Sequence, residues 1–269
     1  MEQENPKTQD LIPPLPNATL FDGKLIIFTT FYQQQAHSRY TQSMVLTAMV
    51  LERMGIKWDF WPSHGDFHVE HSCNRALAAF LEDEEATDFL IIDSDESWNV
   101  MAILRLLSHK EEVVACAYRM KNNWEKYTCV LKSQNGNFMG KVLGDGTALL
   151  AAERVPGGFL RIKKSAAKLY ADNCGDNWYM DGEKKIPAFF MAGIRDHTFF
   201  SHDYNLSERW KELGMTLWID PNADVHHHGT TVYPGNLDAW LKKAFPLAAQ
   251  EEKEERAFKM VQELARKVA

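Results

Sequence analysis

The chain has 269 residues, 45% of them hydrophobic and 25% charged, which is enough for one large α/β domain with a continuous core. Its formal net charge of −7 argues against a broad basic surface for nucleic acid, but leaves room for a small basic groove. Four widely spaced cysteines without a C-x-x-C pair argue against a zinc cluster or a disulfide framework. The chain has no apolar run of the roughly 18 to 20 residues that a membrane span needs, and its N-terminus lacks a signal-peptide pattern, so we expect a cytoplasmic protein.

The first part of the chain predicts alternating strands and helices. Strands are expected at 25–28, 56–61, 89–92 and 113–118, and helices at about 39–54, 69–81 and 100–107. This alternation predicts an α/β fold with a mostly parallel, Rossmann-like sheet that has helices on both faces.

The regular alternation of strands and helices ends after the fourth expected strand. Segments 127–131 and 137–142 flank an Asn135-Gly136 turn and predict a small antiparallel hairpin. Further strands are expected at 159–163, 216–219 and 223–227, and helices at 165–172 and 206–213.

The ends of the chain differ in composition from its middle. Four prolines predict a flexible arm over residues 1–22. Residues 23–235 contain no proline-glycine linker, so we expect one domain there, followed by a charged helical extension over 236–269.

The first candidate for chemistry is Asp93-Ser94-Asp95, which directly follows the apolar run FLII. In open α/β sheets, ligands bind in the crevice at the carboxyl ends of the strands. Two carboxylates on one turn can converge on a hard cation and on a ribose or phosphate beside it. The alternative is an ordinary solvated turn.

The second candidate is the run His226-His227-His228-Gly229. Side chains alternate along a strand, so His227 shares a face with Val225, while His226 and His228 point the other way. An imidazole suits Mn²⁺ as a third ligand beside carboxylates. A surface histidine cluster is the competing interpretation.

Three further segments carry polar groups or permit close backbone approach. Asp203, in Ser201-His202-Asp203, could cap the following helix or act as a general base toward an acceptor hydroxyl. Asn74-Arg75 sits in the second helix, and Arg75 could pair with a donor phosphate or be an ordinary surface arginine. The pair Gly157-Gly158 permits an acceptor or sugar to approach the backbone, or forms a simple turn.

Taken in chain order, these segments resemble small GT-A glycosyltransferases of bacteria and phages. The resemblance spans roughly residues 24–232 and rests on IIFTT, SCNRALAAFL, DFLIIDSDESW, VVACAYRMK, PGGFLRIKK and the stretch from SHDYNLSERW to DVHHHGT. The chain departs from the family pattern at His202, where relatives carry Glu, and at Asn74-Arg75, where many relatives carry arginine first.

The resemblance implies a metal-dependent transfer of a sugar, of the glucose type from a UDP-sugar, to an acceptor hydroxyl. It implies a Mn²⁺ or Mg²⁺ ion held by Asp93, Asp95 and His227, with Asp203 as the catalytic carboxylate. The donor nucleotide would contact Thr29, Thr30, Asn74, Arg75, Asp93, Ser94 and Lys121, and the acceptor would lie beside Gly157, Gly158 and His202.

The acceptor stays open at this point. A glycan and a hydroxymethylated base of phage DNA are both compatible, the second through a basic patch formed by Lys163, Lys164, Lys168, Lys184 and Lys185. Two other classes compete with the transferase: a metal-dependent phosphohydrolase using the same carboxylates and histidines, and a non-catalytic carbohydrate-binding protein.

Overall fold

The structure, a computed structural model, describes residues 21–64, 68–229 and 231–245. Its helices are α1 (Ser38–Arg53), α2 (Val69–Glu82), α3 (Val100–Ser108), α4 (Lys164–Asp172), α5 (His202–Glu212) and α6 (Leu237–Ala244), with a short 3-10 turn at Tyr32–Gln34.

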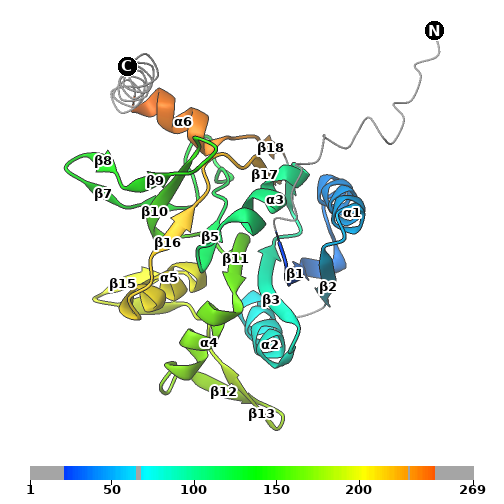
Figure 1. Ribbon diagram of the computed structural model, residues 1–269. Helices are drawn as coiled ribbons and strands as arrows, with labels where there is room; N and C mark the ends of the chain where they lie inside the picture. The colour runs from blue at the N-terminus through cyan, green and yellow to red at the C-terminus, as the bar shows by residue number, and fades with distance from the viewer. Residues whose placement is uncertain (1–20, 65–67, 230, 246–269) are drawn as a thin grey trace, which may run out of the picture.

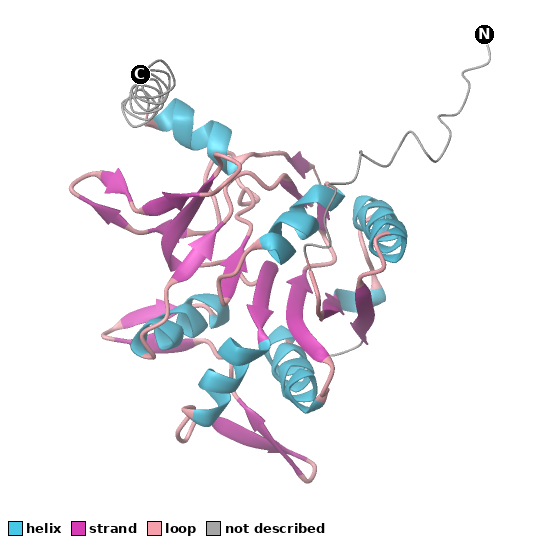
Figure 2. Ribbon diagram, viewed as in Figure 1, coloured by secondary structure: helices cyan, strands magenta, loops and turns pink. Residues whose placement is uncertain are grey.

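A nine-stranded sheet runs through the centre of the molecule in the order β2-β1-β3-β11-β5-β16-β10-β6, with β9 also paired to β10 (Figures 1 and 2). Its strands are β1 (Lys24–Phe31), β2 (Lys57–His64), β3 (Ala86–Ile92), β5 (Val113–Ala115), β6 (Val130–Leu131), β9 (Gly140–Val142), β10 (Ala148–Arg154), β11 (Phe159–Lys163) and β16 (Leu217–Ile219).

Smaller sheets are attached to this centre. They comprise β4 (Glu96–Trp98), β17 (Val225–His228) and β18 (Val232–Tyr233) in one sheet, and the pairs β7 (Ser133–Gln134) with β8 (Asn137–Phe138), β12 (Trp178–Asp181) with β13 (Lys184–Pro187), and β14 (Gly193–Arg195) with β15 (Thr198–Phe200). In Figure 1 the β12–β13 hairpin projects from the body of the molecule below α2 and α4.

The sheet is buried on both faces because successive apolar side chains of its strands point in opposite directions. Ile26 and Phe28 of β1 pack in one hydrophobic cluster with residues of α2, α4 and α5. Leu25 and Ile27 of the same strand pack in a second cluster with residues of α1 and α3. The continuous apolar run of β1 therefore supplies both halves of the core.

The strand directions decide what meets at each edge of the sheet. β1 runs parallel to β2 and to β3, and β5 runs parallel to β16. β11 lies between β3 and β5 and is antiparallel to both. In this part of the sheet β1, β2, β3, β5 and β16 therefore share one direction, and the start of β11 lies at the edge where those five strands end.

The predicted α/β fold with a central, mostly unidirectional sheet, flanking helices and small hairpins is confirmed. The hairpin differs in detail: the Asn135-Gly136 turn joins β7 to β8, with φ of 52° and 83° as a type I′ turn requires, but β6 and β9 pair with β10 rather than with each other. The prediction had no strand at β10, which is why the partners of β6 and β9 were missed.

The ends of the chain are described only in part. The predicted arm at 1–22 lies almost wholly outside the described residues, and so does the helical extension beyond residue 245. The extension does begin with a helix, α6. Among the described residues, no helix has the length and apolar character needed to cross a membrane.

Candidate functional site

A cavity of about 420 Å³ lies at the edge of the sheet where the parallel strands end. Three segments line this cavity. Asp93 directly follows β3, Gly157 and Gly158 directly precede β11, and His202 and Asp203 lie at the start of α5. These three segments are distant in sequence, and the antiparallel insertion of β11 places its first residues beside the end of β3. The resulting site combines carboxylates, the His202 imidazole and the backbone of two glycines, which carry no side chain.

Gly158 is in tight contact with three acidic or phenolic groups. A Cβ on Gly158 would lie 2.4 Å from Oδ2 of Asp93, 2.4 Å from the hydroxyl of Tyr118 and 2.8 Å from Oε1 of Glu96. The Asp93 backbone N–H also donates to the Gly158 carbonyl at 2.8 Å. Only glycine fits at this position, and it holds the β3 and β11 ends together.

The Asp93 carboxyl sits in surroundings that disfavour its charge. Burial, and then the neighbouring Asp95 carboxylate, raise the pKa of Asp93 to about 6. Burial and a neighbouring carboxylate both disfavour the charged form, so this carboxyl is easier to protonate than an exposed aspartate.

Glu96 and Tyr118 belong to the site although the sequence did not single them out. Glu96 is fully buried, and burial and then the Asp93 charge raise its pKa well above the ordinary value. Among the described residues neither of its carboxylate oxygens accepts a hydrogen bond of good geometry, although the Tyr118 hydroxyl lies close by. No local sequence signal separates Glu96 from its neighbours, but a fully buried glutamate is rare in folded proteins unless it is paired.

Asp95 lies between a cation and an imidazole. Its Oδ2 accepts a hydrogen bond from the Lys121 ammonium, and its Oδ1 lies 3.7 Å from Nε2 of His227. The His227 Nδ1 atom lies 3.1 Å from the carbonyl oxygen of Arg119, which fixes the proton on Nδ1 and leaves the Nε2 lone pair directed at Asp95. Burial and then the Lys121 charge lower the pKa of His227 and so disfavour the charged ring.

The other two histidines of the run have different surroundings. Backbone alternation places His228 on the opposite face of β17 from His227, buried, with Nε2 2.7 Å from the Ser97 hydroxyl and its ring stacked on His37 at 4.1 Å. Burial and then the nearby His37 lower the pKa of His228 to about 4. His226 pairs with Ser97 in the β4–β17 register, and His227 is the histidine whose Nε2 atom lies 3.7 Å from Asp95.

The segment after β1 closes the other side of the Asp93–Asp95 turn. The His37 N–H donates to the Ser94 carbonyl at 2.9 Å. Thr29 is fully buried and shares a 2.8 Å hydrogen bond with the Tyr40 hydroxyl, whereas Thr30 is partly exposed. Of the two threonines, Thr30 is therefore the one available to a ligand.

The structure separates Asn74 from Arg75. Asn74 is buried; its side chain accepts from the Phe190 N–H at 2.7 Å and donates to the Phe190 carbonyl at 2.9 Å. Arg75 is exposed and pairs with Asp181 of β12 at 2.9 Å. Asn74 thus fixes a wall of the cavity through Phe190, while Arg75 contacts the β12–β13 hairpin and is not brought to the cavity.

Asp203 is held by several donors at the start of α5. Its Oδ1 accepts from the Ser201 hydroxyl and from the Tyr204 N–H at 2.8 Å, and its Oδ2 accepts from the Gly157 N–H at 3.3 Å. This carboxylate therefore ties the Gly157-Gly158 segment to the first turn of α5.

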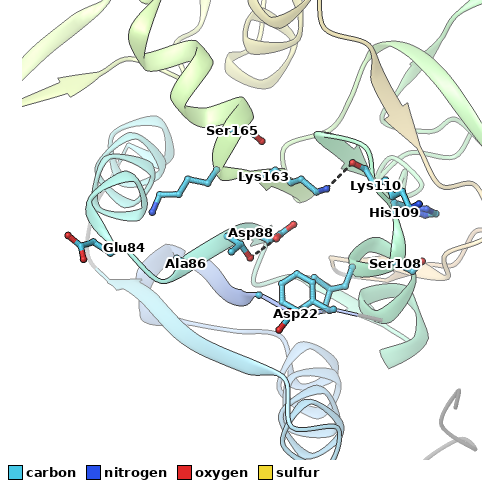
Figure 3. A pocket seen from close by; sticks show the side chains of 14 residues that line it. Asp22, Glu84, Ala86, Asp88, Ser108, His109, Lys110, Lys163 and Ser165 are labelled. Atoms are coloured by element: carbon cyan, nitrogen blue, oxygen red, sulfur yellow. Dashed lines mark hydrogen bonds between the residues drawn. The ribbon is translucent and has the colours of Figure 1, made fainter. Parts of the chain in front are cut away.

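The five lysines of the DNA hypothesis do not gather at this edge. β11 starts at the cavity and ends at Lys163, so Lys163 and Lys164 lie at the opposite edge of the sheet, beside a second cavity of about 560 Å³ (Figure 3). There Lys163 donates to the Lys110 carbonyl at 2.8 Å. The other three bind acidic or aromatic groups: Lys168 pairs with Asp172, Lys184 with Glu82, and Lys185 lies over the Trp178 ring.

The fit of a divalent ion can be judged from the donor atoms. Asp95 Oδ1 and His227 Nε2 are oriented toward each other at a separation that two ligands of one ion can have, given metal–ligand distances of about 2.0–2.2 Å. Within residues 21–64, 68–229 and 231–245, no three His, Cys, Asp or Glu side chains are placed to hold a metal ion. Mg²⁺ sites that substrate phosphates complete use as few as one or two protein carboxylates, and this pair supplies one of them.

Comparison with known proteins gives structural likeness alone. No family model matches the sequence, and the comparison with curated proteins gives no match. The similar solved structures include A197 from STIV, with TM-score 0.46 and 12% identity over 80% of this chain and 95% of that one. They also include the catalytic domain of Drosophila beta1,4galactosyltransferase 7 in complex with xylobiose, with TM-score 0.44 and 10% identity over 80% and 69% of the two chains. GalNAc-T7 with UDP, GalNAc and Mn²⁺ gives a TM-score of 0.41 and 8% identity over 76% of this chain and 43% of that one. Likeness at this level assigns no activity.

Proposed function

We propose that this protein is a metal-dependent glycosyltransferase that moves a sugar, of the glucose type from a UDP-sugar, to an acceptor hydroxyl. The observation that carries the proposal is the meeting of Asp95, His227 and Lys121 on one side of the sheet edge with the Asp203-bearing cavity beside it. Asp95, His227 and Lys121 suit a nucleoside diphosphate and its counterion, and the cavity suits an acceptor that carries a hydroxyl group.

On the donor side, Asp95 and His227 would hold Mn²⁺ or Mg²⁺, and Asp93 would contact the ion or the ribose. The ion supplies neutralisation of the charge that develops on the diphosphate leaving group. Lys121 releases Asp95 and pairs with a phosphate oxygen, because a flexible, partly exposed ammonium can exchange one anion for another. Thr30 and Ser94 line the nucleoside side.

On the acceptor side, the Gly157-Gly158 backbone lets the acceptor approach the donor sugar without a side chain in the way. Asp203 anchors that backbone and the first turn of α5, and His202 lies beside it in the cavity. The acceptor is a hydroxyl of a glycan or of a hydroxymethylated DNA base. The lysine placement favours the glycan, since those basic residues lie at the far edge of the sheet.

Calorimetry with UDP-, GDP-, CMP- and dTDP-sugars, each with and without Mn²⁺, tests the proposal. One donor should bind only with metal, and binding should disappear in the Asp95→Ala, His227→Ala double variant but persist in His226→Ala. No binding of any donor by the wild type would overturn the transferase. Release of phosphate or nucleoside monophosphate without any transfer to an acceptor would instead indicate a phosphohydrolase.

A further inference from the structure

His202 lies between an acidic partner and the cavity. Its Nδ1 atom is 3.3 Å from Oε1 of Glu70, which comes from the first turn of α2. Its Nε2 atom is 4.0 Å from the position that a Cβ on Gly157 would occupy. One ring nitrogen therefore faces a carboxylate, and the other faces the Gly157-Gly158 segment where the acceptor is proposed to lie.

The surrounding packing fixes this orientation. The Phe190 ring meets the His202 ring edge to face, with centroids 5.7 Å apart. Phe190 is itself held at both its N–H and its carbonyl by Asn74, which lies one turn after Glu70 on the same side of α2. One helix face thus supplies both the partner of His202 and the support of the aromatic ring beside it.

Asp203 has less freedom to take a proton than His202. Its carboxylate already accepts hydrogen bonds from Ser201, Tyr204 and Gly157. Both oxygens of Asp203 are therefore engaged in holding the Gly157 backbone and the first turn of α5. Among the described residues, none donates such a hydrogen bond to the Nε2 atom of His202. Imidazole is also the side chain best suited to accept a proton near neutral pH.

We infer that Glu70 and His202 form a catalytic dyad in which His202 is the general base, an inference that rests on the proposed glycosyl transfer. Glu70 holds the proton on Nδ1 and so leaves the lone pair on Nε2. The acceptor O–H gives its proton to Nε2 while its oxygen forms a bond to the anomeric carbon. The bond from that carbon to the diphosphate breaks, and its electron pair stays on the diphosphate. A single displacement of this kind inverts the anomeric centre.

Several titratable groups face His202 and will shape its pH response. They are Glu70 of α2 and the groups that line the same cavity, namely Cys73 of α2, Asp93 after β3, Tyr118 after β5, and Asp203 and Tyr204 of α5. A tautomer measurement separates the effect of Glu70 from the others, because it reports which ring nitrogen carries the proton.

The first arm of the test is ¹⁵N NMR of the full chain labelled at histidine, with the His202 signals assigned through His202→Gln. In neutral wild-type protein, Nδ1 should be protonated and Nε2 bare. Glu70→Gln should remove this preference, and Glu82→Gln, an exposed glutamate at the other end of α2, should leave it unchanged. A bare Nδ1 in the wild type, or an unchanged tautomer in Glu70→Gln, would overturn the dyad.

The second arm follows UDP release from UDP-glucose with Mn²⁺, water serving as acceptor, between pH 5 and 9. His202→Gln should lower kcat by about 100-fold and abolish the acidic limb of the pH profile. Glu70→Gln should lower kcat by about 10-fold, and Glu82→Gln should match the wild type. Loss of the acidic limb in Asp203→Asn with its retention in His202→Gln would make Asp203 the base and refute the role of His202.

The two arms also separate this inference from the proposed function. A wild type that binds and turns over no donor overturns the transferase and with it the catalytic role of His202, whatever tautomer NMR reports. A wild type that turns over UDP-glucose while His202→Gln keeps full kcat leaves the transferase standing and overturns the dyad alone.

Discussion

The imidazole of His227 points its Nε2 atom at Oδ1 of Asp95 across 3.7 Å, and its other nitrogen is held by the Arg119 carbonyl at 3.1 Å. The backbone carbonyl takes the Nδ1 proton, which fixes the tautomer and, in the function proposed above, leaves the Nε2 lone pair for a metal ion beside Asp95. Asp95 lies in the turn just before β4 and His227 lies in β17, and the pairing of these two strands brings the residues together.

Replacing His227 by alanine should weaken Mn²⁺ binding by at least about 10-fold, since even outer-shell partners of a ligand are worth 10- to 100-fold in affinity. Titration of Mn²⁺ followed by electron paramagnetic resonance measures this directly. His226→Ala is the matched control, because His226 neighbours His227 on the strand and pairs with Ser97 in the register. Equal weakening in both variants would show that the effect comes from the strand rather than from a ligand.

Lys121→Met should tighten Mn²⁺ binding in the absence of nucleotide. The Lys121 ammonium occupies Oδ2 of Asp95, and a cation arriving there meets both competition and repulsion. At the effective dielectric of a partly exposed site, removing one such charge is worth about 1 kcal/mol, or roughly 5-fold in affinity. The same Mn²⁺ titration, repeated at low and high salt, tests it, and the effect should shrink as salt rises.

Lys126→Met, in the same loop, provides the comparison and should leave Mn²⁺ affinity unchanged. If Lys121→Met instead weakens Mn²⁺ binding, Lys121 would be a structural support of the Asp95 turn rather than a competitor of the ion.

The sequence predicted the Asp93–Asp95 turn well because an apolar strand followed by acids is a local pattern. Strand alternation also separated His227 from its neighbours for the same reason. Periodicity says nothing about strand direction, however, so the antiparallel β11 and the contact of Gly158 with Asp93 could not be predicted. The pairing of Glu70 with His202 spans 132 positions of sequence, the difference between 202 and 70, and depends on how α2 and α5 pack.

The lack of information on strand direction also explains why the positions of the five lysines could not be predicted. Lys163, Lys164 and Lys168 follow the glycines of the cavity closely in sequence. A five-residue strand separates Gly158 from Lys164, and crossing the sheet moves the lysines to its other edge. Proximity along the chain was therefore a poor guide to proximity in space.

Gly158→Ala should disrupt the site sharply. Its Cβ would fall 2.4 Å from Asp93 Oδ2 and from the Tyr118 hydroxyl, so the β3 and β11 ends must separate. Overpacking of this kind costs about 1–3 kcal/mol of the free energy of unfolding. Chemical denaturation gives that free energy, and donor binding by calorimetry should weaken as well.

Gly144→Ala is the control, because nothing lies within 4 Å of the Cβ it would introduce. We expect its unfolding free energy to stay within about 0.5 kcal/mol of the wild type. A Gly158→Ala protein as stable as Gly144→Ala would mean that the Asp93, Tyr118 and Glu96 side chains move aside at no cost.

Glu96→Gln should make stability less dependent on pH in chelator-treated, metal-free buffer. Burial raises the pKa of Glu96 well above its ordinary value, so the folded state keeps a proton that the unfolded chain releases. Stability then falls as pH rises from the unfolded pKa through the folded one, because the native state binds more protons across that window. Asp93, whose pKa is raised to about 6, contributes in the same direction, so glutamine at position 96 should reduce the slope of stability against pH without abolishing it.

Urea unfolding followed by tryptophan fluorescence at pH 5, 6, 7 and 8 measures this slope, with exposed Glu85→Gln as control. Since glutamine resembles the protonated acid, the variant should be at least as stable as the wild type at pH 8. A wild-type slope retained in Glu96→Gln would show that Glu96 is ionised in the folded protein and that another group carries the raised pKa.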